Sequence, residues 1–301
     1  MRAAAIVPVH GFAPYLAEAL DCVLGEEPAQ VVVVDDGSPE PLRLHPDHAP
    51  RCTLVRRERA GGPAVARATG LEAVDETVEA IALCDADDAW EPGSLARRLA
   101  ALGDDPGAAL AFGRAAIVGP DGRATEERWE EPAGGAHEGG ALAFWLYAAN
   151  PLCTSSVVLR RAALQDAGGF AAGFRVAEDW ELWLRLVARG ARFRCVPEAV
   201  VRYRRHPGGL TADVEALARA QHRLHARHAG LVNDRTRRRA QARDLAALAD
   251  GLAARGAHRE ARAALRGSLR LGGPSPRSVA RLVALAVPGV RGSIGRRAPY
   301  R

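Results

Sequence analysis

The order of apolar and polar residues along the first part of the chain predicts alternating strands and helices. Continuous apolar runs, which are typical of strands buried on both faces of a sheet, occupy residues 3–9, 30–34, 52–56 and 78–84. Helical patterns lie between these runs: one begins near Pro14, one follows Gly61 and Gly62, and one is opened by Pro92. This alternation predicts an α/β fold with a Rossmann-like, mainly parallel sheet flanked by helices.

The pattern changes after residue 107. Residues 109–124 predict a hairpin that turns at Gly119–Gly122, and the polar, glycine-rich residues 123–140 predict a mobile loop. A strand is expected at 199–205, and the later residues read as helices rich in Ala, Leu and Arg. We therefore expect two domains, an α/β domain over residues 1–212 and an Arg-rich α-helical region over residues 213–301.

Charge is distributed unevenly between these two parts. Residues 1–212 hold 22 Arg and 30 Asp or Glu, a net charge of −8, whereas residues 213–301 hold 19 Arg and 6 acids, a net charge of +13. All 41 basic residues are arginine, which together with abundant Ala and Gly indicates a GC-rich coding bias. The basic region therefore fits either a peripheral contact with an anionic membrane or a solvated surface produced by that bias. Nucleic acid is not expected as a partner, because no aromatic interleaving or known binding module is present.

The cysteines and the apolar segments bear on the compartment. The 5 cysteines are scattered without CxxC spacing, which favours buried free thiols and a reducing, cytoplasmic environment over a disulfide framework or a zinc site. Pro8 and His10 interrupt the N-terminal apolar run, so it reads as a first strand and not as a signal peptide. The apolar stretch at 282–290 is too short to span a bilayer.

Two clusters of carboxylates follow two of the predicted strands. Asp35 and Asp36 end the second strand, and Asp85, Asp87 and Asp88 follow the fourth. Open α/β sheets bind ligands at the carboxyl ends of their strands. Carboxylates that crowd the rim of a core repel one another and lose hydration, which favours a bound cation. Oxygen ligands select Mg²⁺ or Mn²⁺, ions that bridge substrate phosphates.

Five stretches of the sequence resemble family 2 glycosyltransferases in their order and spacing: VPVHGFAPYLAEALDCVL, VVVVDDGS, ALCDADDAWEPGSL, TSSVVLRRAALQDAGGF and AEDWELWLRL. The resemblance covers about residues 3–210. It implies a GT-A fold and an inverting transfer of sugar from a nucleoside-diphosphate sugar to a hydroxyl. The acceptor class stays open among glycans, lipid-linked molecules and small molecules.

On the donor side, the resemblance implies that Asp36 binds the nucleotide base. A carboxylate accepts hydrogen bonds from ring N–H groups, so it suits uracil, thymine or guanine, although either Asp35 or Asp36 could equally cap the turn that follows. Pro8 and His10 are expected to touch the base, with His10 in place of a common aromatic residue. Arg67 would contact base or phosphate, but the asparagine that usually follows it is Ala68 here.

The resemblance also implies a metal site. Asp85 and Asp87 form the DxD pair, in which Asp87 ligates Mn²⁺ or Mg²⁺ directly and Asp85 reaches the ribose or a metal-bound water. His206, in a late YRRH pattern, is expected to approach the metal or the diphosphate. Asp88 is expected to cap the helix that Pro92 opens.

The motif AEDWELWLRL implies the catalytic base. Asp179 would take the proton of the acceptor hydroxyl, and Glu178 would orient the acceptor or serve a structural role. Inversion requires attack opposite the leaving nucleotide, so base and metal must flank the anomeric carbon. The sugar and acceptor side is expected to include Asn150, Thr154, Ser155 and Trp180, of which Trp180 also falls on the apolar face of its helix.

The later residues resemble one helical hairpin of the tetratricopeptide type, with Gly256 at the turn and Ala261 at the tight helix contact. Two rival functions remain beside sugar transfer. A nucleotidyltransferase needs a basic, glycine-rich phosphate loop after the first strand, which PVHGFAPYL lacks. A catalytically degenerate nucleotide-sugar-binding or scaffold protein of a glycan-assembly pathway is favoured by Ala68 and opposed by the intact acidic motifs.

Overall fold

The computed structural model describes residues 1–127, 132–210, 213–273 and 280–282. The chain divides into two compact units, Met1–Pro207 and Gly208–Arg301. The boundary between the units therefore follows Pro207, whereas the sequence pattern placed it after residue 212.

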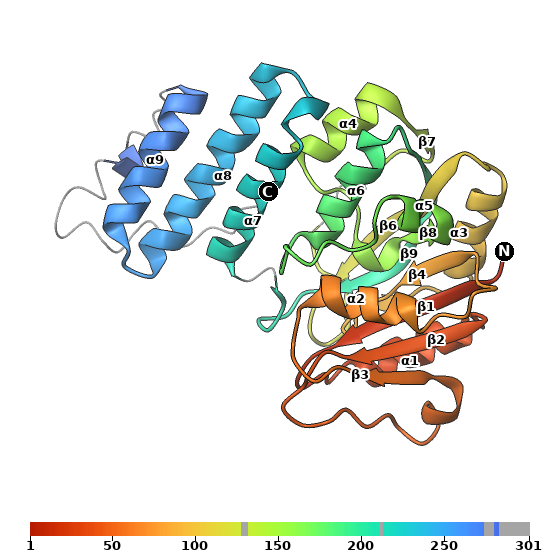
Figure 1. Ribbon diagram of the computed structural model, residues 1–301. Helices are drawn as coiled ribbons and strands as arrows, with labels where there is room; N and C mark the ends of the chain where they lie inside the picture. The colour runs from red at the N-terminus through yellow and green to blue at the C-terminus, as the bar shows by residue number, and fades with distance from the viewer. Residues whose placement is uncertain (128–131, 211–212, 274–279, 283–301) are drawn as a thin grey trace. The chain divides into compact units, whose positions relative to one another are not determined.

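The first unit is built on a 9-stranded sheet with the order β3-β2-β1-β4-β8-β6-β9-β5, in which β7 pairs with β9 (Figure 1). Its strands are β1 (Ala3–Val9), β2 (Gln30–Asp35), β3 (Thr53–Arg56), β4 (Ala80–Leu83), β5 (Ala89–Trp90), β6 (Ala108–Val118), β7 (Gly135–His137), β8 (Val158–Arg160) and β9 (Arg192–Arg204). Strands β1 to β4 pair in parallel, β8 is antiparallel to both β4 and β6, and β9 is parallel to β6. The predicted α/β fold is confirmed, with the parallel half at its start.

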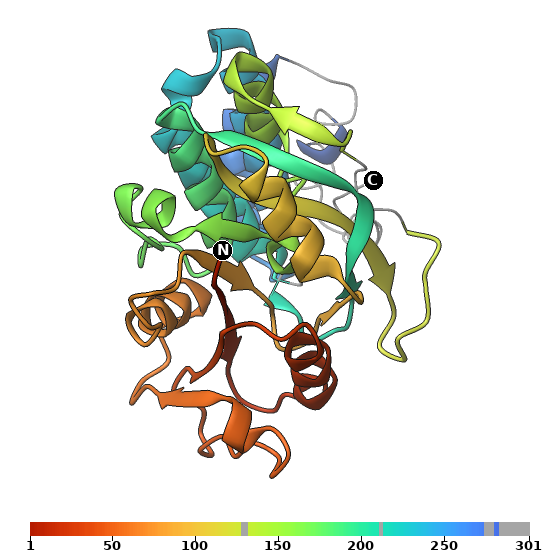
Figure 2. The same cartoon turned by 90° about the vertical axis from the view of Figure 1, so that its right-hand side faces the viewer.

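Six helices of the first unit have the bounds α1 (Leu16–Gly25), α2 (Pro63–Glu72), α3 (Ser94–Gly103), α4 (Gly139–Ala148), α5 (Arg161–Asp166) and α6 (Glu178–Ala188). Alternate residues of β1 point to opposite faces of the sheet. Ala5 and Val7 pack in one core cluster with Leu20 of α1, while Ile6 faces Gly70 of α2. Helices α1 and α2 therefore cover opposite faces, as Figure 2 shows from the side.

The segment after β6 departs from its prediction. The turn at Gly119–Gly122 forms, with Gly119 N donating to Arg123 O at 2.8 Å, but the returning strand is a single bridge between Val118 and Ala124. The polar stretch 123–140 is not one loop, because β7 pairs with β9 inside it and α4 begins at Gly139. Residues 128–131 lie outside the described residues.

The second unit contains α7 (Val214–Arg227), α8 (Asp234–Ala254) and α9 (His258–Gly272). Gly256 occupies the turn between α8 and α9 with a φ of +85°, and Ala261 is fully buried, as the hairpin pattern predicted. The core of this unit joins Ala218 of α7, Leu252 of α8 and Leu265 of α9. No helix in the described ranges is long and apolar enough to cross a bilayer.

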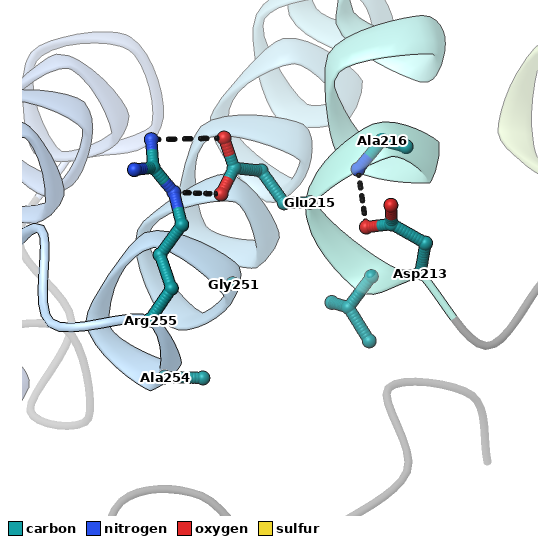
Figure 3. A pocket seen from close by; sticks show the side chains of 7 residues that line it. Asp213, Glu215, Ala216, Gly251, Ala254 and Arg255 are labelled. Carbon is teal, nitrogen blue, oxygen red and sulfur yellow. Dashed lines mark hydrogen bonds and ion pairs between the residues drawn. The ribbon is translucent and has the colours of Figure 1, made fainter.

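The start of α7 and the end of α8 meet at a shallow hollow (Figure 3). A Cβ atom at Gly251 would lie 2.9 Å from Glu215 Cα, so the two helices touch here. Arg255 Nε donates to Glu215 Oε2 at 2.5 Å, and Asp213 caps α7 by accepting from Ala216 N at 3.0 Å. The Arg255 guanidinium is therefore paired with a carboxylate at this end of the unit.

Candidate active site

The predicted site residues lie at one edge of the sheet. β1, β2 and β4 are parallel, so Pro8, Asp36 and the acidic turn after β4 share an edge. β9 runs in the same direction as β4, since β8 is antiparallel to both β4 and β6, and His206 therefore joins this edge. The residues just before antiparallel β8, which include Asn150 and Thr154, reach it from the opposite direction.

Asp35 and Asp36 hold two different segments. Asp35 accepts from Ser38 N at 2.9 Å, from Leu42 N at 3.0 Å and from the Arg56 guanidinium. Burial alone would raise the pKa of Asp35, but these hydrogen bonds outweigh burial and lower it below its ordinary value. Asp35, not Asp36, is therefore the residue that caps the following turn.

Asp36 binds the loop that leads into α2. Its carboxylate accepts from Gly61 N at 3.0 Å, from Gly62 N at 2.7 Å and from the Arg57 guanidinium. His10, which is exposed, places its Nδ1 2.9 Å from Asp36 O. Pro8 is half-buried at the end of β1. The residues expected at the nucleotide base thus lie together, with the loop at Gly61 and Gly62 packed against them.

Arg67 is a buried bridge between the acidic turn and α6. Only 2% of its side chain is exposed, with Nη2 donating to Asp85 Oδ1 at 2.5 Å and Nη1 donating to Glu178 Oε1 at 2.6 Å. The buried Nε has no hydrogen-bond partner within the described ranges. In this structure the Arg67 guanidinium lies between the Asp85 and Glu178 carboxylates, and its contact with base or phosphate stays a prediction.

Glu178 opens α6 and is almost fully buried. Burial raises the pKa of Glu178 to about 7, against the opposing effect of Arg67. Glu178 was expected either to orient the acceptor or to serve a structural role, and its contact with Arg67 is of the structural kind.

Asp179 lies beside Glu178 but faces a different segment. Its Oδ2 accepts from Asn150 Nδ2 at 2.9 Å and from Thr154 Oγ1 at 2.8 Å. Both hydrogen bonds end at Oδ2, so among the described residues Oδ1 remains available to a further donor in this half-exposed side chain. The structure therefore brings together Asp179, Asn150 and Thr154, which the sequence placed on the acceptor side.

Two residues expected on the acceptor side lie elsewhere. Ser155 is fully buried beneath the acidic turn, where its hydroxyl donates to Asp88 Oδ2 at 2.6 Å and accepts from Asp85 N at 2.9 Å. Trp180 is buried between α6 and α4 and donates from Nε1 to Leu146 O at 2.6 Å. Both side chains support the site from inside the core in this structure, and their place on the acceptor side stays a prediction.

Asp88 also differs from its prediction. It does not cap the helix after Pro92, because its carboxylate accepts from Ser155 Oγ and from Arg204 N at 2.9 Å. Glu26 supplies that cap instead, by accepting from Gly93 N at 2.5 Å and from Leu95 N at 2.8 Å. Burial, with the charges of Asp85 and Asp87, raises the pKa of Asp88 well above its ordinary value.

Asp87 and His206 face each other at the open side of the turn. His206 Nε2 lies 2.9 Å from Asp87 Oδ2, with 20% and 36% of the side chains exposed. Burial and the neighbouring Asp85 charge raise the pKa of Asp87, and His206 opposes this. In the part of the chain that is described, no three His, Cys, Asp or Glu side chains gather closely enough to hold a metal ion. One carboxylate and one imidazole still fit Mn²⁺ or Mg²⁺ when substrate phosphates complete the shell.

Two supporting residues were missed by the sequence reasoning. The Tyr15 ring lies 5.4 Å from the His206 ring, and the Arg204 guanidinium lies 4.3 Å from the centre of the Tyr15 ring. Arg204 Nε donates to Asp87 O at 3.0 Å, and its Nη2 donates to Glu18 Oε2 at 2.6 Å. Arg204 and His206 are two residues apart at the end of β9. This spacing is the sequence feature that could have indicated that Arg204 supports His206.

Comparison with known proteins identifies the family. Residues 4–177 match the family model described as Glycosyl transferase family 2. The chain belongs to this family. Pre-mycofactocin glycosyltransferase of Mycobacterium tuberculosis is 30% identical over 202 residues, which are 65% of this chain and 41% of that protein. Succinoglycan biosynthesis protein ExoU of Rhizobium meliloti is 30% identical over 240 residues, 71% of this chain and 67% of that protein. The chain thus spans about two fifths of the length of the first relative.

Solved structures of other proteins share the fold of this chain. S. aureus TarS 1-349 in complex with UDP-GlcNAc gives a TM-score of 0.67 at 18% identity, covering 94% of this chain and 84% of that chain. Mannosyltransferase PcManGT from Pyrobaculum calidifontis, in complex with GDP-Man and Mn²⁺, gives 0.58 at 21% identity, covering 95% and 79%. The GT-A type of fold predicted for this family 2 chain is confirmed.

Proposed function

We propose that the protein transfers a sugar from a nucleoside-diphosphate sugar to an acceptor hydroxyl, with inversion at the anomeric carbon and with the help of a divalent cation. The observation that carries this proposal is the Arg67 bridge. It fixes the start of α6, which bears Asp179, against the acidic turn that bears Asp85 and Asp87. A base and a diphosphate site held at a fixed separation are what an in-line displacement requires. Two structural neighbours were solved with sugar nucleotides.

Asp87 and His206 would hold Mn²⁺ or Mg²⁺, which when bound neutralises charge on the departing diphosphate. Asp85, already ion-paired with Arg67, is proposed to face the ribose side of the donor. The Tyr15 ring would orient His206, and Arg204 would hold the backbone carbonyl of Asp87 in place.

Asp179 is the proposed general base. Asn150 and Thr154 hold its Oδ2, so Oδ1 receives the proton of the acceptor hydroxyl. The acceptor oxygen forms a bond to the anomeric carbon while the bond from that carbon to the diphosphate oxygen breaks. The electron pair of the broken bond leaves with the nucleoside diphosphate.

The donor base is proposed to lie against Pro8, His10 and Asp36, at the ends of β1 and β2. Because Arg57 ion-pairs with Asp36, the Arg57 guanidinium belongs to the same proposed site. The acceptor is proposed to approach Asn150 and Thr154, and its class stays among glycans, lipid-linked molecules and small hydroxyl compounds.

The test is calorimetric titration with UDP, dTDP, GDP and CDP, each with and without Mn²⁺. We expect one diphosphate to bind in a Mn²⁺-dependent manner, with binding lost in Asp87→Ala and kept in Asp179→Asn. Hydrolysis or transfer from the matching sugar nucleotide should be lost in Asp179→Asn. Asp166→Asn, which alters an exposed carboxylate on α5, is the matched control and should behave as wild type. Failure of all four diphosphates to bind would contradict the proposal and favour a scaffold function.

A further inference from the structure

A row of arginines covers one face of α9. Arg259, Arg262, Arg266 and Arg270 recur every three or four residues and so lie on the same side of the helix. We call these four residues the α9 basic face. At 100° per residue, the buried positions fall on the opposite side of the helix; they are Ala261, Ala264, Leu265 and Ser268. The basic face therefore points away from the helix packing.

Among the described residues, the acids of α8 and α9 form no ion pair with Arg259, Arg266 or Arg270. Four acids occur in the two helices, and each is engaged elsewhere: Asp234 with Arg237, Asp244 with His225, Asp250 with Arg281 and Glu260 with Arg255. Arg259, Arg266 and Arg270 are exposed and form no ion pair within residues 1–127, 132–210, 213–273 and 280–282. Arg255, by contrast, is paired with Glu215.

Coding bias alone does not explain this charge. A bias acts on the whole chain, yet residues 1–212 combine 22 Arg with 30 acids, whereas residues 213–301 combine 19 Arg with 6. What distinguishes the helical unit is the scarcity of acids. A surface that keeps arginine without compensating carboxylates is electrostatically suited to an anionic partner.

We propose that the α9 basic face docks on the surface of an anionic phospholipid bilayer. From Arg259 to Arg270 the face extends about 16 Å along a straight helix, which suits a flat, repeating array of phosphates. Guanidinium groups bind phosphate oxygens in a bidentate manner. Arg266 and Arg270 line a shallow hollow with Ala263 and Leu269, so apolar and cationic groups alternate there as at the boundary of headgroups and acyl chains.

Nucleic acid is the rival partner with the same phosphate chemistry. Proteins that bind single-stranded nucleic acid combine positive charge with aromatic side chains on which bases stack. Residues 208–299 contain no Phe, Trp or Tyr. The observations therefore favour lipid. Docking of α9 is also independent of sugar transfer, because no residue of the basic face belongs to the candidate active site.

The test is co-sedimentation of the full chain with vesicles of phosphatidylcholine, alone or with about 30% phosphatidylglycerol, at about 50 and 300 mM NaCl. We expect binding to the anionic vesicles at low salt and none to phosphatidylcholine alone. The variant R259Q/R266Q/R270Q should bind at least about tenfold more weakly. The matched control R43Q/R123Q/R189Q removes three exposed arginines from the first unit and should bind as wild type.

Circular dichroism should show equal helix content in both triple variants, so a loss of binding is not a loss of folding. Absence of wild-type binding to anionic vesicles would overturn the proposal. Equal losses in the two triple variants would also overturn it, because net charge and not the α9 face would then govern binding. Tighter binding to polyuridylic acid than to vesicles, at equal phosphate concentration, would assign the face to nucleic acid instead.

Discussion

At the scale of single residues, the site is organised by side chains that serve two partners at once. Arg67 holds Asp85 with one nitrogen and Glu178 with another, across 111 residues of sequence between Arg67 and Glu178. Ser155 both donates and accepts at the acidic turn. Such residues fix the distance between two segments, so their removal should disturb the segments together.

Replacing Arg67 with methionine should lower the free energy of unfolding by about 3–5 kcal/mol, because the buried Glu178 and the partly buried Asp85 lose their cation. Arg67→Lys should be only partly tolerated, since an ammonium group cannot present a rigid fork to both partners. Urea unfolding measures both. Arg189→Met, at an exposed position, is the control and should change stability by less than about 0.5 kcal/mol. An Arg67→Met protein as stable as the control would refute the bridge.

Glu178 should make stability depend on pH. Its pKa is about 7 in the folded chain against an ordinary 4.5, so between these values the folded state binds more protons than the unfolded state. Stability contributed by this group is present below pH 4.5 and is lost as pH rises toward 7, by about 3 kcal/mol in all. Urea midpoints at several pH values should fall less steeply in Glu178→Gln than in wild type. The exposed control Glu198→Gln should keep the wild-type slope.

Tyr15 should act through His206. Loss of its ring in Tyr15→Leu removes the contact that orients the imidazole toward Asp87, and we expect Mn²⁺ to bind about tenfold more weakly in the presence of the nucleoside diphosphate. Tyr15→Phe keeps the ring and should retain affinity. Electron paramagnetic resonance of free Mn²⁺ measures both constants without turnover. Equal Mn²⁺ affinity in Tyr15→Leu and wild type would show that His206 needs no such support.

At the scale of elements, α2 is pressed against the sheet through a glycine. A Cβ atom at Gly70 would lie 2.6 Å from Ile6 Cγ2 and 3.1 Å from Val34 Cγ2. Gly70→Ala should therefore destabilise the fold by about 1–3 kcal/mol in thermal or urea unfolding, despite the better helix propensity of alanine. Gly103→Ala, at the open end of α3 with no atom within 4 Å, should be neutral or slightly stabilising. A Gly70→Ala protein more stable than wild type would mean that α2 shifts to make room.

The elements also show what sequence reasoning could reach. The strands β1, β2 and β4 were predictable because their residues are continuously apolar. The partners of Asp88 and Arg67 were not predictable. They belong to segments far away in the sequence, and only the folded structure determines which of several chemically equivalent groups lies within hydrogen-bond distance. Asp88 lies next to its helix in sequence, yet Ser155 and Arg204 take its carboxylate and Glu26 caps the helix. Local propensity had no information on these contacts.

At the scale of the whole molecule, the chain joins an acidic part to a basic part. Net charges of −8 over residues 1–212 and +13 over residues 213–301 should attract different copies of the protein to one another at low salt. Sedimentation velocity should show larger species at about 20 mM than at about 300 mM NaCl, where the screening length is far shorter. R259Q/R266Q/R270Q should reduce this association. Sizes that do not change with salt would show that the opposite charges do not meet between copies.

The division of α9 into a buried face and a basic face separates two kinds of selection. Ala261, Ala264 and Leu265 are constrained by packing within the helical unit. Arg259, Arg266 and Arg270 are exposed and are constrained by the partner that the surface binds. Substitutions on one side leave the other untouched. Substitutions could therefore lower, raise or reverse the charge of α9 one residue at a time while the helical hairpin and the first unit stay folded. Adaptation to a different binding surface would begin at this helix.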